Sequence, residues 1–203
     1  MRQLIILISL TGFFLSIPVL SLAQEDSTAL KKQLNLTGGV YNNHIFRFET
    51  VEGAGNYADG PTAEYGLDFY IPMDDRLWMG LGLYYMKARN VYHSPATDYR
   101  RGYLLNHVSE VIHLPVTWRY DITPWFAFKV GMSISIEFPR ENSLNQNGLG
   151  FHGGLIIHHS PLPWLDLGVE PTIHLTSMLP IPEEFYQRHF LLSGVRTYAA
   201  IRF

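Results

Sequence analysis

Apolar and polar residues alternate one by one along much of this chain, and this period of two constrains its fold more than any other feature. The clearest run covers residues 125–138, where the even positions carry large apolar side chains and most odd positions carry small or charged ones. Successive side chains of a β-strand point to opposite faces, so each such run predicts a strand with one apolar and one polar face. After the N-terminal segment, no stretch shows a sustained helical period.

Eight segments alternate in this way, which favours an all-β chain. They lie at residues 34–41, 63–71, 77–85, 107–119, 125–138, 149–158, 165–175 and 191–203. Three connections are short and rich in turn residues, and the other four are longer and polar: 73–75, 121–124 and 160–163, against 42–61, 90–103, 139–146 and 178–189. Short turns at one end and long loops at the other are typical of outer-membrane barrels, and an even strand number predicts that both termini lie in the periplasm.

A soluble lipocalin-like carrier also has eight strands, so the character of the two faces must separate it from a membrane barrel. A soluble exterior would carry about 25–35% charged residues. The polar face here is rich in Gly, Ser, Thr and Asn instead, which suits the narrow bore of eight strands. The apolar face is long enough for the roughly 25 Å apolar belt of such barrels. We therefore predict an eight-stranded antiparallel up-and-down transmembrane β-barrel over residues 24–203, with the lipocalin-like barrel as the alternative.

The first 23 residues have the pattern of a signal peptide. Arg2 precedes an almost wholly apolar stretch, and Ser21, Leu22 and Ala23 form a small-x-small cleavage site before polar chain. We expect cleavage there and a mature chain from Gln24, with an uncleaved membrane anchor as the alternative. The chain has no cysteine, which excludes an acylated-cysteine anchor and disulfides. Its net charge of −3 gives no reason to expect a nucleic-acid partner.

Several short motifs resemble the porin-like outer-membrane β-barrel domain family, akin to the small OmpA/OmpX-type barrels. They are YGLDFYIP at 65–72, GLGLYY at 80–85, IHLPV at 112–116 and the terminal Phe203. The resemblance covers Leu34 to Phe203 and implies a cell outer membrane location, contact with its lipid and lipopolysaccharide, and recognition by the barrel-insertion machinery. In this family a terminal aromatic strand is implied to be the insertion signal, which would be Ile201 and Phe203 here. Tyr198 falls on the other face, which departs from the usual spacing.

Charged residues on the polar face are expected to point into the bore. They are Glu64, Asp68, Arg119, Lys129, Glu137, Asp166, Glu170, Arg196 and Arg202. Because both signs are present, we interpret them as an ion-pair network that plugs the barrel, with Glu170 and Arg196 as a pair on adjacent strands. Removing one partner of a buried pair would leave the other charge without compensation.

Histidines and one serine offer the only hints of other chemistry. His107, His113, His152, His158 and His174 have inward parity, yet their spacing suggests different heights and hydrogen bonding in place of a metal site. His174 and Ser177 near the loop end resemble two parts of a lipid A deacylase site, but the His-Ser-Asn type motif of those enzymes is absent and no acid can be placed. We therefore expect no catalytic residue, cofactor or metal.

Three features at the ends and middles of the strands carry further expectations. All four tryptophans lie beside the short turns: Trp78, Trp118, Trp125 and Trp164. Together with Tyr120 and Phe203 they predict an aromatic girdle at that end of the barrel. By parity Trp118 faces outward, and the other three tryptophans can close the opening of the bore at the turn end. Pro115 and Pro171 fall mid-strand and predict bulges. Glu110 has outward parity, which is tolerable only near the upper interface.

These observations together predict an integral outer-membrane barrel without enzymatic activity, whose lumen is filled by side chains and whose role is structural or one of surface interaction. A narrow porin for ions or small solutes is the alternative, and a lipid A-modifying enzyme is a further one. Aromatic and arginine residues in the long loops could contact an unidentified extracellular partner: His44 to Phe48, Tyr92, Tyr99 to Arg101, and Phe185 with Tyr186.

Overall fold

The structure is a computed structural model, and it describes residues 31–46, 56–93, 104–138, 144–180 and 188–203. This part of the chain consists of strands joined by turns and irregular segments. The strands are β1 (Gln33–Phe46), β2 (Asn56–Ala58), β3 (Gly60–Pro72), β4 (Leu77–His93), β5 (Leu104–Thr123), β6 (Phe126–Glu137), β7 (Gly148–Leu162), β8 (Leu165–Pro180) and β9 (His189–Arg202). None of the described residues belongs to a helix that is long and apolar enough to cross a membrane. The predicted signal peptide, residues 1–23, lies outside the described residues.

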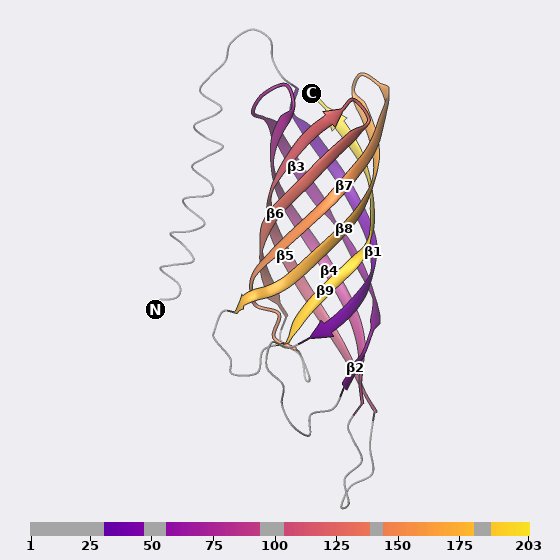
Figure 1. Cartoon of the computed structure of the whole chain (residues 1–203), viewed down its shortest axis with the longest axis vertical. Coiled ribbons are helices and arrows are strands. Elements are labelled where there is room, and N and C mark those ends of the chain that lie inside the picture. Colours follow the sequence, from indigo (N-terminus) through magenta and orange to yellow (C-terminus); the bar gives the residue numbers. More distant parts are fainter. Residues whose placement is uncertain (1–30, 47–55, 94–103, 139–143, 181–187) are drawn as a thin grey trace, which may run out of the picture.

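The eight long strands close into a cylinder (Figure 1). Each pairs antiparallel with the next long strand along the chain, and β1 pairs with β9 over fourteen residue pairs from Gln33↔Arg202 to Phe46↔His189. The short strand β2 extends the β3 edge by pairing with the end of β4. Closure leaves no open edge, so every long strand has a neighbouring strand on both sides. The predicted fold, an eight-stranded antiparallel up-and-down barrel, is confirmed.

The three predicted short turns lie together at the end of the barrel that also holds the C-terminus (Figure 1). Two of them are shorter than the sequence suggested, because β5 and β7 extend into them and leave only two residues between β5 and β6 and between β7 and β8. The four-residue turn between β3 and β4 is held by Asp74, whose carboxylate accepts backbone hydrogen bonds from Arg76 and Leu77 at 2.7 and 2.6 Å. These hydrogen bonds hold the pKa of Asp74 below its usual value.

The strands also run further into the predicted long loops than the alternation indicated. For example, β1 continues to Phe46 and β4 to His93, beyond the expected ends at residues 41 and 85. The ladder needs only backbone partners, so it persists where the apolar pattern that marks the lipid-facing belt has stopped. Barrel wall therefore continues past the apolar belt at the loop end.

The burial of side chains shows which face of each strand points outward. Along β6 every odd-numbered residue from Ala127 to Glu137 is buried, while the even-numbered apolar residues from Phe126 to Ile136 are partly or fully exposed. The same parity holds along the other long strands, with Leu36, Leu83 and Ile173 among the exposed apolar side chains. Ile71 and Met79, which pair across β3 and β4, share the outward face yet are buried. Apolar side chains thus cover the outside, and small, polar and ionic ones line the bore.

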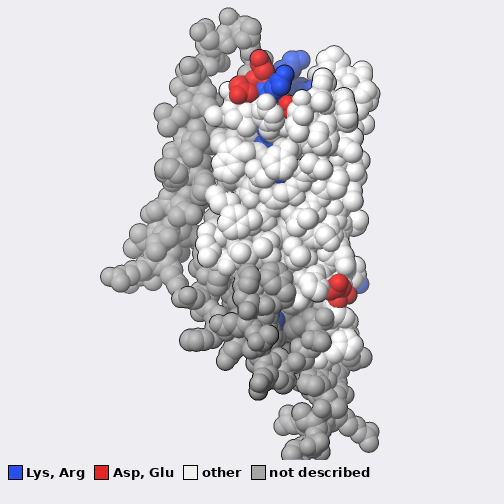
Figure 2. Space-filling model, viewed as in Figure 1, with Lys and Arg blue, Asp and Glu red and all other residues white. Residues whose placement is uncertain are grey.

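The outer surface carries its charges near the ends. Figure 2 shows charged side chains gathered at the turn end, a second charged spot toward the loop end, and uncharged surface between them. Exposed aromatic residues ring the turn end: Trp118, Tyr120, Trp125, Trp164 and Phe203. Trp125 and Trp164 lie in the turns and do not close the mouth. Trp78 alone of the four tryptophans points inward, where its indole N–H donates to Asp121 at 2.9 Å.

The two mid-strand prolines interrupt pairing without forming the predicted bulges. Pro115 pairs with Ser133 on β6, but the β4–β5 ladder lacks partners for residues 114 and 115 and resumes in the same register. Pro171 behaves likewise between β7 and β8 while it keeps its pairing with β9. A proline removes only one backbone donor, and the uninterrupted ladder with the other neighbouring strand holds the proline-containing strand in place. The bulge in β8 lies instead near Ser177, whose φ is 53°.

Glu110 faces outward, as its parity predicted, and has a cationic partner on the neighbouring strand. Lys87 is its register partner on β4, and the Lys87 Nζ lies 3.1 Å from a Glu110 carboxylate oxygen. An ion pair of this kind tolerates an outward position near an interface better than a single charge does.

One close approach in the wall can be tested directly. A Cβ added to Gly66 would lie 2.3 Å from the Leu83 carbonyl oxygen and 2.8 Å from the Tyr84 Cα, whereas a Cβ on Gly38, one strand away, would meet nothing within 4 Å. We expect Gly66→Ala to lower the free energy of unfolding by about 1–3 kcal/mol, because backbone must move to make room. Gly38→Ala should leave it unchanged. Urea titration of the folded band on unboiled SDS gels measures both; equal effects would contradict this account of the wall.

Candidate functional site in the barrel bore

All nine charged residues expected in the bore lie on the inward face. Eight of them are almost fully buried, and Arg202, at the turn end, is partly exposed. They fall into separate groups along the bore, not into one continuous network. Asp68 and Glu137 have no ion-pair partner within 4 Å among the described residues and accept hydrogen bonds from neutral donors.

The central group joins four strands, β3, β6, β8 and β9. The Arg196 guanidinium lies 2.7 Å from Glu64 and 3.9 Å from Glu170, and the Lys129 Nζ donates to Glu170 at 2.5 Å. Glu170 and Arg196 are register partners, as the sequence suggested, but each has a shorter contact elsewhere. Arg196 also lies over the Tyr84 ring, with its Cζ 4.6 Å from the ring centroid. Its charge is therefore compensated by carboxylates from β3 and β8, which lie on either side of β9.

Neutral hydroxyl groups complete this central group. Tyr41 donates to Glu64 at 2.9 Å, and the Arg196 Nε donates to the Tyr41 oxygen at 2.5 Å. The Tyr84 hydroxyl donates to Asp68 through a short hydrogen bond, and the Thr37 hydroxyl lies 3.4 Å from the same carboxylate oxygen. Buried carboxylates need such donors when too few cations are available. The two tyrosines have the inward parity of their strands, but parity alone does not show which acid each one meets.

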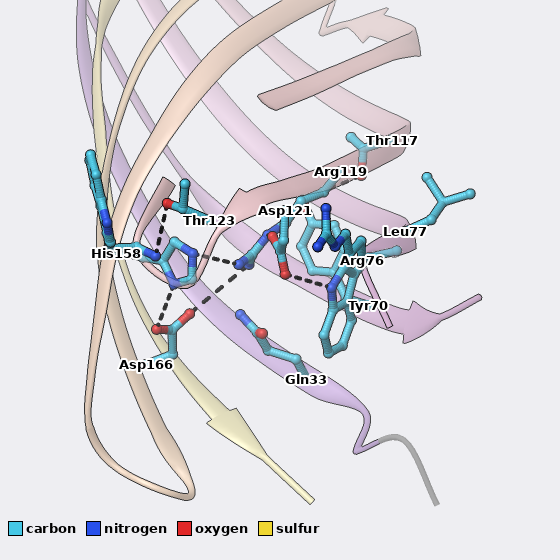
Figure 3. A network of polar contacts seen from close by, with 12 residues as sticks. Gln33, Tyr70, Arg76, Leu77, Thr117, Arg119, Asp121, Thr123, His158 and Asp166 are labelled. Atoms are coloured by element: carbon cyan, nitrogen blue, oxygen red, sulfur yellow. Dashed lines mark hydrogen bonds and ion pairs between the residues drawn. The ribbon is translucent and has the colours of Figure 1, made fainter. Parts of the chain in front are cut away.

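A second polar group closes the turn end, and Figure 3 shows it from nearby. Arg119 lies between two carboxylates: its Nε is 2.7 Å from Asp121, and its guanidinium is 4.0 Å from Asp166. His158 hydrogen-bonds to Arg119 at 3.2 Å and to Asp166 at 3.1 Å. Arg202 reaches Asp166 at 3.2 Å. Sequence reasoning treated Asp121 as a turn residue, although it shares the inward parity of Arg119.

An apolar layer fills the bore on the loop side of the central group, and sequence reasoning missed it. Its members are fully or almost fully buried: Tyr41, Met86, Ala88, Val111, Leu144, Phe190 and Leu192. Met86 and Val111 are register partners and lie two residues beyond Tyr84 and His113 in the loopward direction. Their inward parity was available in the sequence. Apolar residues are so common on the outward face that their presence on the inward one carried no signal.

Glu137 belongs to this loop-side region and not to an ion-pair network. One of its carboxylate oxygens accepts a hydrogen bond from the backbone N–H of Gln146 at 2.6 Å. The Gln146 side chain donates to the Arg188 carbonyl oxygen at 2.8 Å and accepts from Thr176 at 2.5 Å. The residues just before β7 are thus tied across the bore to the entrance of β9. Together with the buried Leu144, they cover the apolar layer.

Three of the five inward histidines meet, which corrects the expectation that they lie at different heights. His152 and His174 are register partners on β7 and β8, with ring centroids 5.7 Å apart. The His113 ring lies 4.8 Å from that of His174. The tilt of the strands brings residues with unrelated sequence positions to one level, because the bore is only a few side chains wide. His158 and His107 lie apart from this group, in the turn-end network and against Tyr92.

The hypothetical deacylase residues do not form a catalytic pair. His174 Nε2 is hydrogen-bonded to the Ser133 hydroxyl at 3.0 Å, and the side-chain oxygen of Ser177 has no hydrogen-bond partner. A serine nucleophile requires a base within hydrogen-bond reach and an acid behind that base. The described residues offer no such relay at Ser177.

Comparisons with known proteins give the fold only. No family model and no curated protein matches this chain. Among solved structures, it is similar to neisserial surface protein A (12% identity, TM-score 0.45, covering 80% of this chain and 95% of that one) and to the outer membrane protein OprG of Pseudomonas aeruginosa (10%, 0.45, 85% and 96%). It is also similar to the attachment invasion locus protein Ail of Yersinia pestis, crystallised with a heparin analogue (9%, 0.41, 86% and 100%). The closed eight-stranded antiparallel barrel has the strand number and topology that the resemblance of the motifs implied.

The central ion pairs predict an asymmetric response to mutation. Lys129 has no ion-pair partner but Glu170 among the described residues, whereas Glu170 keeps Arg196 when Lys129 is lost. We expect Glu170→Gln to lower the free energy of unfolding by about 3–5 kcal/mol, because it leaves a buried ammonium unpaired. Lys129→Met should cost less, and the double variant should recover much of the loss. Denaturant unfolding in detergent micelles measures all three.

The outward pair Lys87–Glu110 provides the matched control. Its side chains are partly exposed, so Lys87→Met and Glu110→Gln should each cost about 0–1 kcal/mol. A loss of the same size at the outward and inward pairs would show that burial in the bore does not govern these energies. Additivity of the two inward substitutions would be equally inconsistent with the contact at 2.5 Å.

Proposed function

We propose that this protein is an integral outer-membrane barrel without enzymatic activity, whose bore is closed by its own side chains and whose role is structural or one of surface interaction. The observation that carries the proposal is the polarity of the wall: apolar side chains face outward along all eight long strands, while the ionic groups between the two ends of the barrel face inward. A water-soluble barrel would need the opposite arrangement. In lipid, an outward apolar face and a fully paired backbone are what a spanning structure requires.

The circle of exposed aromatic residues at the turn end supports a defined orientation in the membrane. Tryptophan and tyrosine favour the level of the lipid headgroups, because their rings are apolar and carry one polar group. Trp118, Trp125 and Trp164 lie at this end, and the chain begins β1 and ends β9 there. In outer-membrane barrels the short turns face the periplasm. The contacts proposed for the outer wall are therefore with membrane lipid and lipopolysaccharide.

Three successive layers support a closed bore. At the turn end Arg119, Asp121 and Asp166 pair across the opening; Arg196 and its carboxylates fill the middle; Phe190 and its apolar neighbours fill the loop side. An ion that crossed the bore would have to displace paired charges and then pass an apolar layer that gives it no ligands. Passage of ions is thus opposed by ionic and apolar barriers in series.

The interaction role rests on the loops, which lie mostly outside the described residues. Most of the aromatic and arginine residues predicted to make contacts there also lie outside the described residues: Arg47, Phe48, Tyr99, Arg100, Arg101, Phe185 and Tyr186. His44 is described, and its Nδ1 lies 2.7 Å from an exposed carboxylate oxygen of Asp59. An extracellular partner remains part of the proposal without an assigned contact.

Cell fractionation tests the membrane location and the insertion signal together. We expect the wild-type chain to pellet with outer membranes and to run as a faster, folded band until it is boiled in SDS. Phe203 is exposed on the outward face, beside Ile201. If these residues carry the insertion signal, Phe203→Ala will lower the folded fraction in cells several-fold yet refold normally in detergent. Trp164→Ala, an exposed aromatic at the same end, is the control and should assemble as wild type.

The outcomes separate the parts of the proposal. A wild-type chain that remains in the soluble periplasmic fraction would overturn the membrane assignment and favour a lipocalin-like carrier. If Phe203→Ala assembles as well as wild type, the proposed insertion signal is wrong, but the assignment as a barrel is unaffected.

Electrical recording tests whether the bore is closed. Protein extracted from outer membranes and added to planar bilayers should give no large, steady openings, whereas a general porin added to the same bilayer should. Steady openings of the purified chain would overturn the plugged bore in favour of the narrow porin. A change in the lipid A mass spectrum on overexpression would overturn the absence of enzymatic activity.

A further inference from the structure

Three histidines and one glutamate from four different strands meet in the middle of the bore. One potential ligand atom each from Glu64 on β3, His113 on β5 and His174 on β8 lie within 4.8 Å of one another, and all three residues are buried. His152 on β7 lies against His174. The mechanism of a plugged bore uses Glu64 as an ion-pair partner but gives the histidines no task.

Each of these four side chains carries a buried polar atom that has no hydrogen-bond partner among the described residues. The atoms are Glu64 Oε2, His113 Nε2, His152 Nε2 and His174 Nδ1, each with almost no exposed surface. A buried polar atom without a partner costs about 1–3 kcal/mol, so native structures rarely leave one, and here four neighbouring side chains each carry one. A cluster of atoms with free lone pairs indicates a ligand that accepts lone pairs.

The remaining atoms of the same side chains are held as metal ligands usually are. His113 Nδ1 hydrogen-bonds to Ser135 at 2.8 Å, and His174 Nε2 hydrogen-bonds to Ser133 at 3.0 Å. When each imidazole donates its N–H to serine, its other nitrogen carries a free lone pair. Such partners fix the tautomer and orientation of metal-bound histidines in general. The other oxygen of Glu64 is fixed likewise by Arg196 and Tyr41.

We propose that Glu64, His113 and His174 bind a divalent transition-metal ion, zinc above all, inside the barrel. Two imidazole nitrogens and one carboxylate oxygen form a common zinc ligand set, and they leave a fourth position, beside which His152 lies. Ligands about 2.1 Å from a tetrahedral ion are about 3.4 Å apart, so atoms that lie up to 4.8 Å apart need to approach one another by as much as about 1.4 Å. Rotation of side chains provides a movement of that size without a change in the wall.

The surroundings favour a cation at this level. Counted at their formal charges, the central carboxylates Glu64, Asp68 and Glu170 exceed the cations Lys129 and Arg196 by one negative charge. Gly131 makes room for His152, because a Cβ there would lie 2.6 Å from the His152 Nε2. The apolar layer begins directly beyond, since Leu192 is the register partner of His174 and Val111 is two residues from His113. An ion in this dry compartment would be shielded from competing water.

Refolding with and without metal tests the site, because an enclosed ion is best loaded while the barrel forms. The chain is unfolded in denaturant with a chelator, refolded in detergent with or without Zn²⁺, and passed through a desalting column. We expect about one zinc per folded chain and an unfolding midpoint that rises when zinc is present. The His113→Gln/His174→Gln double variant should retain none. The exposed histidines provide the matched control, and His44→Gln/His159→Gln should retain zinc as wild type.

Two further measurements decide the outcome if the double variant does not fold, which unboiled SDS gels reveal. Ser135→Ala keeps all the ligands but removes a hydrogen-bond partner of His113, and should weaken zinc binding by about 10–100-fold. Co²⁺ in place of zinc should give the visible absorption of a four-coordinate site in the wild-type protein. Folded wild type that retains no more zinc than the detergent blank would overturn the proposal, and water would then be the partner of these atoms. Equal retention by the folded double variant would overturn it as well. Neither result would bear on the membrane location.

Discussion

Charged side chains that point into this barrel must be compensated inside the bore, and the rest of the structure depends on that constraint. Eight strands close through the β1–β9 ladder and leave a bore just wide enough for side chains. A charge placed there has no room for a hydration shell. Arg196 therefore meets Glu64, Lys129 meets Glu170, and Arg119 lies between Asp121 and Asp166. The inward residues of different strands therefore depend on one another, because each inward substitution changes the partners available to the residues opposite.

The side chains in the bore form three layers, which differ in polarity and in exposure to solvent. The turn end is ionic and close to solvent, with Arg202 partly exposed. The middle is ionic but buried, so its pairs carry more energy and tolerate less change. The loop side is apolar around Phe190 and Leu192, and it separates the middle from the loop end. A sealed centre of this kind suits a barrel that serves as a scaffold for its loops, and it provides a dry compartment where the histidines meet.

Much of the fold could be predicted from the sequence, whereas less of the site could. Alternation identified the strands and their outward residues, because parity along a strand is a local property. Parity placed Glu64 and Arg196 in the bore but could not show that they touch, since β3 and β9 are separated by β1 and their contact depends on strand tilt. The histidine group was missed for the same reason. The loop-side apolar layer was missed because Met86 and Val111 look like ordinary lipid-facing residues until their parity is compared with that of Tyr84 and His113.

By itself, the sequence determined that this chain forms strands with one apolar and one polar face, and which residues lie on each face, since backbone geometry alone sets the period of two. It also determined the end at which the short turns gather. Only the tertiary structure decided which inward residues meet, because the register and tilt of the closed barrel bring distant positions such as 64, 113 and 174 to one level. It likewise decided that the two prolines interrupt pairing without a bulge, because the intact ladder on their other side holds the register.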